Sequence, residues 1–410
     1  MKVLQINAVN GIRSTGRICT EIADYLNSNG DEGYIAYSHG VPYEKGYRIG
    51  SAMDVKLHGL LSRITGLQGY FSKHSTKKLI KFIDKIKPDI IHLHNLHSNY
   101  INLKLLLSYI ATNDIATVIT LHDCWFFTGK CCHYTVDNCF KWHKKCYDCP
   151  RIHKDNPSWF FDRTKKMFQD KKEWFRKIPR LAVIGVSDWL TNEAFKSHLS
   201  SAKIIKRIYN WIDLNVFRST NGDHLREQLG ISDKYIILGV SVYWSNNTKG
   251  LDEFIELAKL LPDDIQIILI GNVKDDTSLP KEIINITETN NINELVTCYS
   301  AADVLLNLSP EETFGLVSVE ALSCGTPVIA YNSTACSEVI GDSNCGIIVD
   351  VGNMDEIISA IMKIKCNGKS FYSKECRNRA AFLYDKNKNI FEYYKIYQSL
   401  SIEKAAVEYE

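Results

Sequence analysis

Short apolar runs separated by amphipathic segments recur along the chain, and this pattern predicts strands that alternate with helices. The first run, Met1 to Asn7 (MKVLQIN), predicts a buried parallel strand, and a helix is expected over 18–28. Regular alternation of this kind predicts parallel sheets covered by helices. Further strands are expected at 89–94, 117–120, 181–186, 204–209, 235–242, 265–270 and 304–308, and helices at 75–87, 103–111, 251–261, 292–300 and 374–397.

The chain has 410 residues, of which 45% are hydrophobic, and this length suits two domains better than one core. A polar segment, Arg218 to Asp223, separates two series of alternating elements. We therefore predict an α/β protein with two doubly wound, Rossmann-like domains, at 1–217 and 218–373. The remaining segment, 374–410, is expected to be helical and to pack back on the first domain.

A glycine-bearing turn, Asn10 to Arg17 (NGIRSTGR), follows the first predicted strand. The spacing from Gly11 to Gly16 is not GxGxxG, so it is weak evidence for a dinucleotide. Glycine and unpaired helix N–H groups would let a ligand approach closely, and a tight connection alone explains the turn equally well. The strand at 117–120 leads into His122 and Asp123, which places both at the carboxyl edge of a sheet, where ligands bind in open α/β folds.

Two carboxylates, Glu312 and Glu320, lie before and within a predicted helix that starts near Gly315. The first N–H groups of such a helix lack intrahelical partners and lie at the positive end of its dipole, which suits a diphosphate. Glu312 precedes the helix and Glu320 lies about two turns into it. The two acids are therefore expected to hold two ends of one polar ligand rather than to share a proton.

The net charge of +2 conceals an asymmetry between the halves. Residues 1–217 contain 32 Lys and Arg against 19 Asp and Glu, and the rest contains 17 against 28. A basic half suggests an anionic surface as partner, although a solvated surface gives the same count. No apolar run is long enough to cross a bilayer and no secretion signal is recognised, so we expect a cytoplasmic protein.

The thirteen cysteines are concentrated in an insertion at 124–150, which contains six of them. A reduced cytosolic chain is not expected to form disulfides. The Cys-x-x-Cys pair together with two further thiols predicts a structural zinc site, with His133 and His143 as substitute ligands. Free thiols, or a redox pair at the last two cysteines, are the alternatives. The predicted ligands are Cys132, Cys139, Cys146 and Cys149.

The segment 159–180 carries aromatic residues at seven-residue intervals among many lysines. Such a stripe is more often directed into a core. It would also suit a helix on an anionic membrane, so we predict that this helix contributes to peripheral association with the inner face of the plasma membrane.

Taken together, the sequence from Tyr299 to Ala330 (YSAADVLLNLSPEETFGLVSVEALSCGTPVIA) resembles the family 4 retaining glycosyltransferases, which have the GT-B fold. The motifs PDIIHLHN, TLHD, VSDWL, NWIDLNVF and TKGLDEFIELA extend the resemblance over nearly the whole chain. The cysteine-rich stretch resembles a subset found in bacterial surface-polysaccharide clusters. The resemblance implies that the first domain binds the acceptor and the second binds a nucleotide sugar.

The resemblance also implies roles for individual residues. Glu312 would hold donor-sugar hydroxyls, Glu320 the ribose, and Lys249 the diphosphate. His122 would lie beside the donor sugar and Gly16 beside its phosphate. The backbone of Phe314, Gly315 and Leu316 would contact sugar and phosphate, and that of Thr289 and Asn290 the base.

Two positions depart from the family pattern. Thr248 stands where an Arg usually accompanies the Lys, so Arg13 or Arg17 would have to replace it. Ser333 to Ala335 (STA) stands where paired glycines are common.

The implied reaction is transfer of a sugar from a nucleotide diphosphate, UDP before GDP, to a hydroxyl of a polyprenyl-diphosphate-linked glycan. It retains the anomeric configuration and needs no metal or other cofactor for catalysis. A nucleotide-sugar epimerase or hydrolase, and a non-catalytic nucleotide-sugar-binding protein, are the rival hypotheses. No nucleic-acid partner is expected, because the basic half has no recognised reading motif.

Overall fold

A computed structural model describes residues 1–244, 249–274 and 278–408, with side chains to residue 401. It divides the chain into two compact units, Met1–Ile208 with Ile390–Glu410 (unit 1) and Tyr209–Asn389 (unit 2). The predicted boundaries at 217/218 and 373/374 both fall within unit 2.

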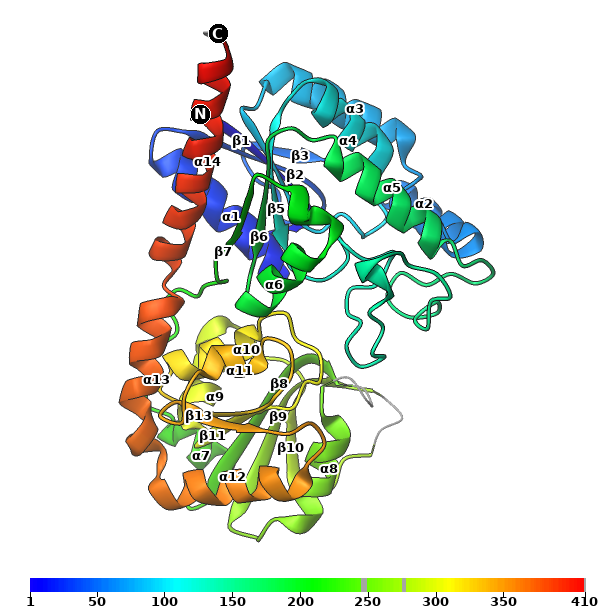
Figure 1. The fold of residues 1–410 in the computed structure, drawn as a ribbon. Helices are drawn as coiled ribbons and strands as arrows, with labels where there is room; N and C mark the ends of the chain where they lie inside the picture. The colour runs from blue at the N-terminus through cyan, green and yellow to red at the C-terminus, as the bar shows by residue number, and fades with distance from the viewer. Residues whose placement is uncertain (245–248, 275–277, 409–410) are drawn as a thin grey trace. The chain divides into compact units, whose positions relative to one another are not determined.

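Unit 1 contains a parallel sheet of seven strands in the order β3-β2-β1-β4-β5-β6-β7. The order of the strands reverses between β1 and β4, so these two form the topological switch point. Figure 1 shows α3, α4 and α5 together on one side of this sheet, away from α1 and α14. The strands are β1 (Lys2–Asn10), β2 (Glu32–Gly40), β3 (Gly46–Arg48), β4 (Ile90–Leu93), β5 (Ala116–Leu121), β6 (Leu181–Gly185) and β7 (Ile204–Arg207). The helices are α1 (Arg13–Ser28), α2 (Ala52–Thr65), α3 (Lys73–Ile86), α4 (Leu103–Thr112), α5 (Thr164–Arg176) and α6 (Asp188–Lys196), with short 3-10 turns at Lys141–His143 and His198–Ser201.

Unit 2 contains a second parallel sheet, of six strands in the order β10-β9-β8-β11-β12-β13. Its order reverses between β8 and β11, which form the second switch point. The strands are β8 (Tyr235–Trp244), β9 (Ile265–Val273), β10 (Ile283–Ile286), β11 (Val304–Asn307), β12 (Val328–Tyr331) and β13 (Gly346–Val349). The helices are α7 (Asp223–Gln228), α8 (Leu251–Leu260), α9 (Ile292–Ala301), α10 (Leu316–Ser323), α11 (Cys336–Ile340), α12 (Met354–Asn367) and α13 (Lys369–Leu383).

The last helix, α14 (Lys386–Glu408), starts in unit 2 and joins unit 1 from Ile390 onward. Two of its tyrosines are buried against the unit 1 sheet, where the Tyr397 hydroxyl lies 2.7 Å from His92 Nδ1 and the Tyr393 hydroxyl 2.9 Å from Thr120 Oγ1. The predicted packing of the C-terminal segment on the first domain is confirmed, but that segment consists of two helices separated at Tyr384 and Asp385.

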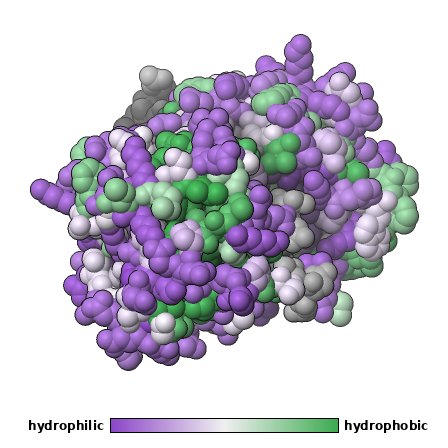
Figure 2. Space-filling model, turned by 90° about the horizontal axis from the view of Figure 1, so that it is seen from below, coloured by the Kyte–Doolittle hydropathy of each residue, from purple (hydrophilic) through white to green (hydrophobic). Residues whose placement is uncertain are grey.

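The central strands β4, β5, β6, β11 and β12 are buried at every residue, so both faces of each sheet are covered there. Buried tryptophans contribute the largest side chains of this interior: Trp125, Trp142, Trp211 and Trp244. Hydrophilic residues cover most of the face shown in Figure 2, with hydrophobic residues gathered near its middle. No helix in the described ranges is both long and apolar enough to cross a bilayer.

Two predicted helices have different bounds in the structure. The first helix begins at Arg13 rather than at Ile18, so Gly16 lies within α1 and not in a loop. The basic helix begins at Thr164 rather than at Trp159, and just before it the Asp162 carboxylate accepts from the Thr164 N–H at 2.8 Å. Its aromatic stripe, with Met167, Phe168, Trp174 and Phe175, is buried, so these side chains face the core and not a membrane.

Candidate active site

The carboxyl ends of β8 and β11 bring two charged residues of unit 2 together at its switch point. Lys249 directly precedes α8, and Glu312 lies in the loop between β11 and α10. Lys249 Nζ forms an ion pair with Glu312 Oε1 and donates to Ser309 Oγ at 3.1 Å. Gly250 allows this approach, since a Cβ there would lie 2.5 Å from Leu308 Cβ. The structure thus joins two residues that are 63 positions apart in the sequence.

Thr334 holds the backbone of Glu312 in place. The Glu312 N–H donates to Thr334 Oγ1 at 3.0 Å, and the Glu312 carbonyl accepts from the Ala335 N–H at 3.3 Å. The STA segment therefore positions the acid from the end of β12. Sequence reasoning noted this segment only as a departure from the family pattern and missed its contact with Glu312.

Gly315 is the residue that directly precedes α10. Its φ of +86° lies in the left-handed region, which favours glycine, and it occupies the N-cap position of the helix. The amides of Leu316 and the following residue start the helix and so have no intrahelical acceptor. The Phe314 side chain is buried between the rings of Tyr209 and Tyr384, at centroid distances of 5.9 and 5.6 Å. Only the backbone of Phe314 is therefore available to a ligand.

Glu320 is almost fully buried on α10 and accepts a hydrogen bond from the Tyr299 hydroxyl at 2.8 Å. Tyr299 was not identified from the sequence. Glu312 is thus partly exposed and Glu320 lies inside unit 2, and their roles toward one ligand stay a prediction.

Thr289 and Asn290 lie between β10 and α9. The Asn290 N–H already donates to Glu294 Oε2 at 2.8 Å, and the Asn290 side-chain amide binds the same carboxylate at 3.0 Å. These hydrogen bonds lower the pKa of Glu294. A base-binding role at this position would therefore fall to the Asn290 carbonyl or to Thr289. Thr248, the position of the missing Arg, lies outside the described residues.

In unit 1, Gly16 packs α1 closely against the end of β1. A Cβ at Gly16 would lie 3.1 Å from the Gly11 nitrogen and 3.2 Å from the Asn10 carbonyl carbon. Any larger side chain would push the helix away from the strand. Close packing therefore accounts for the glycine, and its contact with a donor phosphate stays a prediction.

His122 belongs to a row of three histidines at the carboxyl ends of β4 and β5. His122 Nε2 lies 3.0 Å from His94 Nδ1, and the rings of His92 and His94 are 3.9 Å apart. Burial lowers the pKa of His122 to about 4, against the opposing effect of Asp123, and it holds the pKa values of His92 and His94 well below their usual range. All three imidazoles are therefore neutral at pH 7.

The hydrogen-bond network fixes the tautomer of His122. The Gln5 side-chain N–H₂ donates to the Cys19 carbonyl at 2.7 Å, which leaves Gln5 Oε1 as an acceptor for His94 Nε2 at 3.2 Å. Neutral His94 must then accept through Nδ1, so His122 carries its proton on Nε2.

Asp123 faces His97 rather than His122. His97 Nε2 lies 2.9 Å from Asp123 Oδ2, and the Trp125 N–H donates to Asp123 Oδ1 at 2.8 Å. Burial raises the pKa of Asp123. His97 and these hydrogen bonds lower it by more, so that the pKa is about 2. The carboxylate is thus charged at all physiological pH values.

The four predicted zinc ligands do not form one group. Cys132 lies instead with His97 and Asp123, and this is the one group of three or more candidate metal ligands within 4.8 Å of one another in the described ranges. Cys146 accepts from the Gly129 N–H at 3.1 Å, and Cys149 lies 3.7 Å from Cys131. The predicted set of four ligands is therefore not assembled in the structure: among the described residues, no three of these four sulfurs lie within 4.8 Å of one another.

Two family models match the chain, one in each half. The model described as Glycosyltransferase Family 4 matches residues 15–216, and that described as Glycosyl transferases group 1 matches residues 222–381. Together they span most of the sequence.

Two curated relatives are similar to this chain over more than three quarters of their own length. The putative colanic acid biosynthesis glycosyl transferase WcaC of Escherichia coli (strain K12) is 26% identical, over 76% of this chain and 77% of its own. The alpha-monoglucosyldiacylglycerol synthase of Acholeplasma laidlawii is 24% identical, over 81% and 85%.

Solved structures show the same fold. Anabaena Alr3699/HepE in complex with UDP and glucose superposes with a TM-score of 0.69 at 15% identity, over 97% of this chain and 100% of its own. With the two sheets, the switch points and the matches to both halves, the chain belongs to the family 4, group 1 glycosyltransferases and has their GT-B fold.

Proposed function

We propose that the protein transfers a sugar from a nucleotide diphosphate sugar, with retention at the anomeric carbon, to a hydroxyl of a lipid-linked glycan in bacterial surface-polysaccharide synthesis. The observation that carries this proposal is the Lys249 and Glu312 pair beside the start of α10. The pair offers a cation for the diphosphate and an acceptor-only carboxylate for sugar hydroxyls.

The proposed donor contacts divide along the nucleotide sugar. Lys249 and the amides of Gly315 and Leu316 bind the diphosphate, and Glu312 binds the sugar. Glu320 shares its carboxylate between Tyr299 and the ribose. We further propose that His122 contacts the sugar and that Gly16 contacts the phosphate. UDP is the preferred nucleotide, because Alr3699/HepE was solved with UDP and glucose.

In the proposed reaction, the bond from the anomeric carbon to the β-phosphate oxygen breaks while the acceptor oxygen bonds to the same face of that carbon. The acceptor proton passes to the departing phosphate oxygen, and the nucleoside diphosphate leaves. Negative charge grows on the β-phosphate in the transition state, so Lys249 and the helix amides lower the barrier by stabilising it.

The lipid-linked acceptor is supported by two observations. WcaC is described as a colanic acid biosynthesis enzyme, and residues 1–217 of this chain are strongly basic. A diphosphate-linked lipid acceptor is anionic, so it complements this charge.

The proposal is tested with purified protein, UDP- or GDP-sugars and a polyprenyl-diphosphate-linked acceptor. Mass spectrometry of the product and the anomeric configuration by NMR are the measurements. A product that retains the donor configuration and requires UDP supports the proposal, and inversion contradicts it. Donor consumption without acceptor favours the epimerase or hydrolase, and binding without turnover favours the non-catalytic protein.

We also propose peripheral association with the inner face of the plasma membrane, through a surface other than α5. Helix α2 exposes four apolar side chains at helical spacing, Met53, Leu57, Leu60 and Ile64, which form one stripe. The exposed aromatic residues Trp159, Phe160 and Phe161 lie beside it, since the Trp159 N–H donates to the Arg63 carbonyl at 2.7 Å.

This α2 and aromatic surface is flanked by Lys56, Arg63 and Arg163, so an anionic lipid surface complements both its apolar and its basic groups. Phe160→Ser should lower sedimentation with phosphatidylglycerol vesicles. Phe382→Ser, on α13 in unit 2, is the matched control, because Phe160 is 69% exposed and Phe382 is 74% exposed. Equal sedimentation of the two variants would refute this surface.

A further inference from the structure

Three side chains with metal-ligand chemistry meet at the carboxyl edge of the unit 1 sheet. They are His97, Asp123 and Cys132, and one ligand atom of each lies within 4.8 Å of the other two. His97 follows β4 and Asp123 follows β5, two neighbouring parallel strands, so their loops start side by side. Cys132 comes from the cysteine-rich insertion. The chemistry of the three groups is mixed: one nitrogen, one oxygen and one sulfur.

We infer that His97, Asp123 and Cys132 bind one zinc ion. Zinc accepts imidazole nitrogen, carboxylate oxygen and thiolate sulfur as ligands, whereas magnesium and calcium prefer oxygen. Three protein ligands leave the fourth tetrahedral position to a water molecule. This inference does not depend on the proposed transfer reaction.

The distances fit a zinc ion. His97 Nε2 lies 2.9 Å from Asp123 Oδ2. Zinc bonds of about 2.0 to 2.3 Å place two tetrahedral ligands roughly 3.3 to 3.6 Å apart, so small side-chain rotations bring the three atoms onto one ion. The side chains of His97 and Asp123 are 19% and 13% exposed, which leaves solvent close by for the fourth ligand.

An ion pair alone accounts for this arrangement less well. The His97 Nε2 atom is buried and has no hydrogen bond of good geometry within the described part of the chain, although Asp123 Oδ2 is close to it. A hydrogen bond requires the N–H to be directed at its acceptor. Two ligand atoms that face a shared point, rather than each other, are close without being so directed.

The charges of the ligands balance the charge of the ion. Asp123 and Cys132 each contribute one negative charge when they bind, because carboxylate and thiolate are the ligand forms, and the thiol proton passes to solvent. His97 binds as a neutral imidazole. The two negative ligands therefore offset the two positive charges of zinc, and the site needs no further counter-ion.

Contacts from the surrounding chain hold two of the ligands in place. The Trp125 N–H donates to Asp123 Oδ1 at 2.8 Å, which leaves Oδ2 for the ion. The Cys132 N–H donates to Asp155 Oδ2 at 3.2 Å, and Arg151 Nε forms an ion pair with the same oxygen at 3.3 Å. Outer contacts of this kind orient metal ligands.

The ion joins three segments: the loop after β4, the end of β5 and the insertion. Between β5 and α5, a stretch that the structure describes in full, the regular structure consists of the short turn Lys141–His143. Loops with little regular structure gain folding free energy from a bound metal. Because Asp123 directly follows His122, the zinc ion also positions the loop that begins at that histidine.

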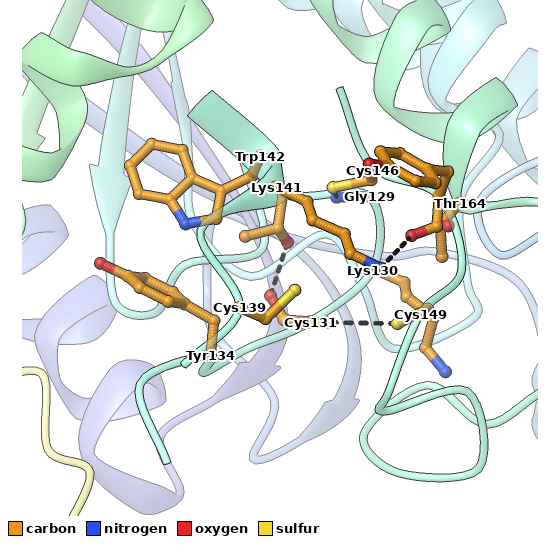
Figure 3. Close-up of a pocket in the computed structure, with 12 residues that line it drawn as sticks. Gly129, Lys130, Cys131, Tyr134, Cys139, Lys141, Trp142, Cys146, Cys149 and Thr164 are labelled. Atoms are coloured by element: carbon orange, nitrogen blue, oxygen red, sulfur yellow. Dashed lines mark hydrogen bonds between the residues drawn. The ribbon is translucent and has the colours of Figure 1, made fainter. Parts of the chain in front are cut away.

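The neighbouring Cys131 belongs to a different group of side chains. It lines a small cavity together with Cys139, Cys146 and Cys149, and Figure 3 shows it opposite Cys149, with 3.7 Å between the two sulfurs. Cys132 is not among the residues that line this cavity. Cys131 is therefore the matched control for Cys132, since both are cysteines of the same loop.

The experiment is metal analysis of tag-free protein that is dialysed against zinc chloride and then against metal-free buffer. About one zinc per chain is expected for the wild type and for Cys131→Ser, and less than roughly a tenth of an equivalent for Cys132→Ser and His97→Gln. Wild type without zinc would overturn the site. Zinc retained in Cys132→Ser, or absent from a folded Cys131→Ser, would overturn it as well.

X-ray absorption at the zinc edge tests the ligand set in the wild type, where no variant has to fold. One sulfur neighbour together with three nitrogen or oxygen neighbours is expected. Two or more sulfur neighbours would assign the ion to the thiols around Cys131 and overturn the proposal. Iron or copper bound in preference to zinc would contradict the identity of the metal.

Discussion

The candidate site residues of the two units differ in charge state: those in unit 2 are charged, and the histidines in unit 1 are neutral. In unit 2, Lys249 and Glu312 form an ion pair whose side chains are 36% and 19% exposed. In unit 1, burial lowers the pKa values of His92, His94 and His122, so all three are neutral at pH 7. The contrast shows two kinds of polar surroundings: a pair of opposite formal charges in unit 2, and neutral imidazoles in unit 1.

The largest expected effect is that of pH on the stability of the folded protein. Histidines with lowered pKa values bind fewer protons in the folded protein than in the unfolded chain, so stability falls as pH drops below about 6.5. Each such histidine contributes up to about 1.4 kcal/mol per pH unit, until its folded pKa is reached. Burial lowers the pKa values of His58 and His122 to about 4, so a loss of several kcal/mol is expected between pH 6.5 and pH 4.5.

Urea unfolding at several pH values measures this loss. His58→Gln is the informative variant, because His58 is not one of the candidate site residues and it hydrogen bonds to Ser72 and Gly69. Its stability should depend less steeply on pH than that of the wild type. Parallel curves would show that burial of this histidine does not control the acid sensitivity.

Removing the charge in unit 2 should impair catalysis rather than stability. Lys249→Ala is expected to lower turnover roughly a hundredfold or more, since loss of one transition-state charge contact costs about 3 to 4 kcal/mol. Lys259→Ala, which removes an exposed lysine near the end of α8, is the control. Initial rates at saturating donor distinguish them, and near-normal turnover of Lys249→Ala would exclude its assigned role.

Removing a hydrogen-bond partner of the buried histidines in unit 1 should impair stability rather than catalysis. Tyr397→Phe leaves His92 Nδ1 buried without its hydrogen bond, and an unsatisfied buried group costs about 1 to 3 kcal/mol. The free energy of unfolding is the measurement, with partly exposed Tyr394→Phe as control. If both substitutions cost the same, the link from α14 to the histidine row is not energetically important.

The smallest expected effect concerns Gly315. Ala at a left-handed position costs roughly 1 to 2 kcal/mol of stability. Gly230 has a φ of +69° with open space around it, and Gly315 a φ of +86° with Asn307 Nδ2 3.2 Å from an added Cβ. The two Gly→Ala variants should therefore lose similar stability, but only Gly315→Ala should raise the KM for the donor. A normal KM would remove Gly315 from the donor site.

The fold and most element positions were predictable, because the strands are continuous apolar runs and the acid pattern around α10 is specific. The start of α1 could not be predicted from the sequence, because its N-cap residue Ile12 provides no side-chain cap and Arg13 has a φ of +56°. Pattern alone also could not identify Lys171 as buried, because its charge is satisfied by the Trp125 carbonyl, 46 residues away.

The zinc ligand set predicted for the insertion was wrong for the same lack of spatial information. Cys131 and Cys132 are adjacent, and spacing arguments cannot tell which of them faces the other thiols. In the structure one lines the cavity and the other lies with His97 and Asp123. Likewise, Thr334 and Tyr299 hold the two acids through contacts that no local motif encodes.

The path of α14 has a consequence for biosynthesis. Unit 1 includes residues from both ends of the chain, whereas unit 2 is one continuous segment. During translation most of unit 1 leaves the ribosome before unit 2, but its core lacks the tyrosines that contact His92 and Thr120 until the C-terminal end of the chain emerges. The unit that leaves the ribosome first is therefore the last to be finished.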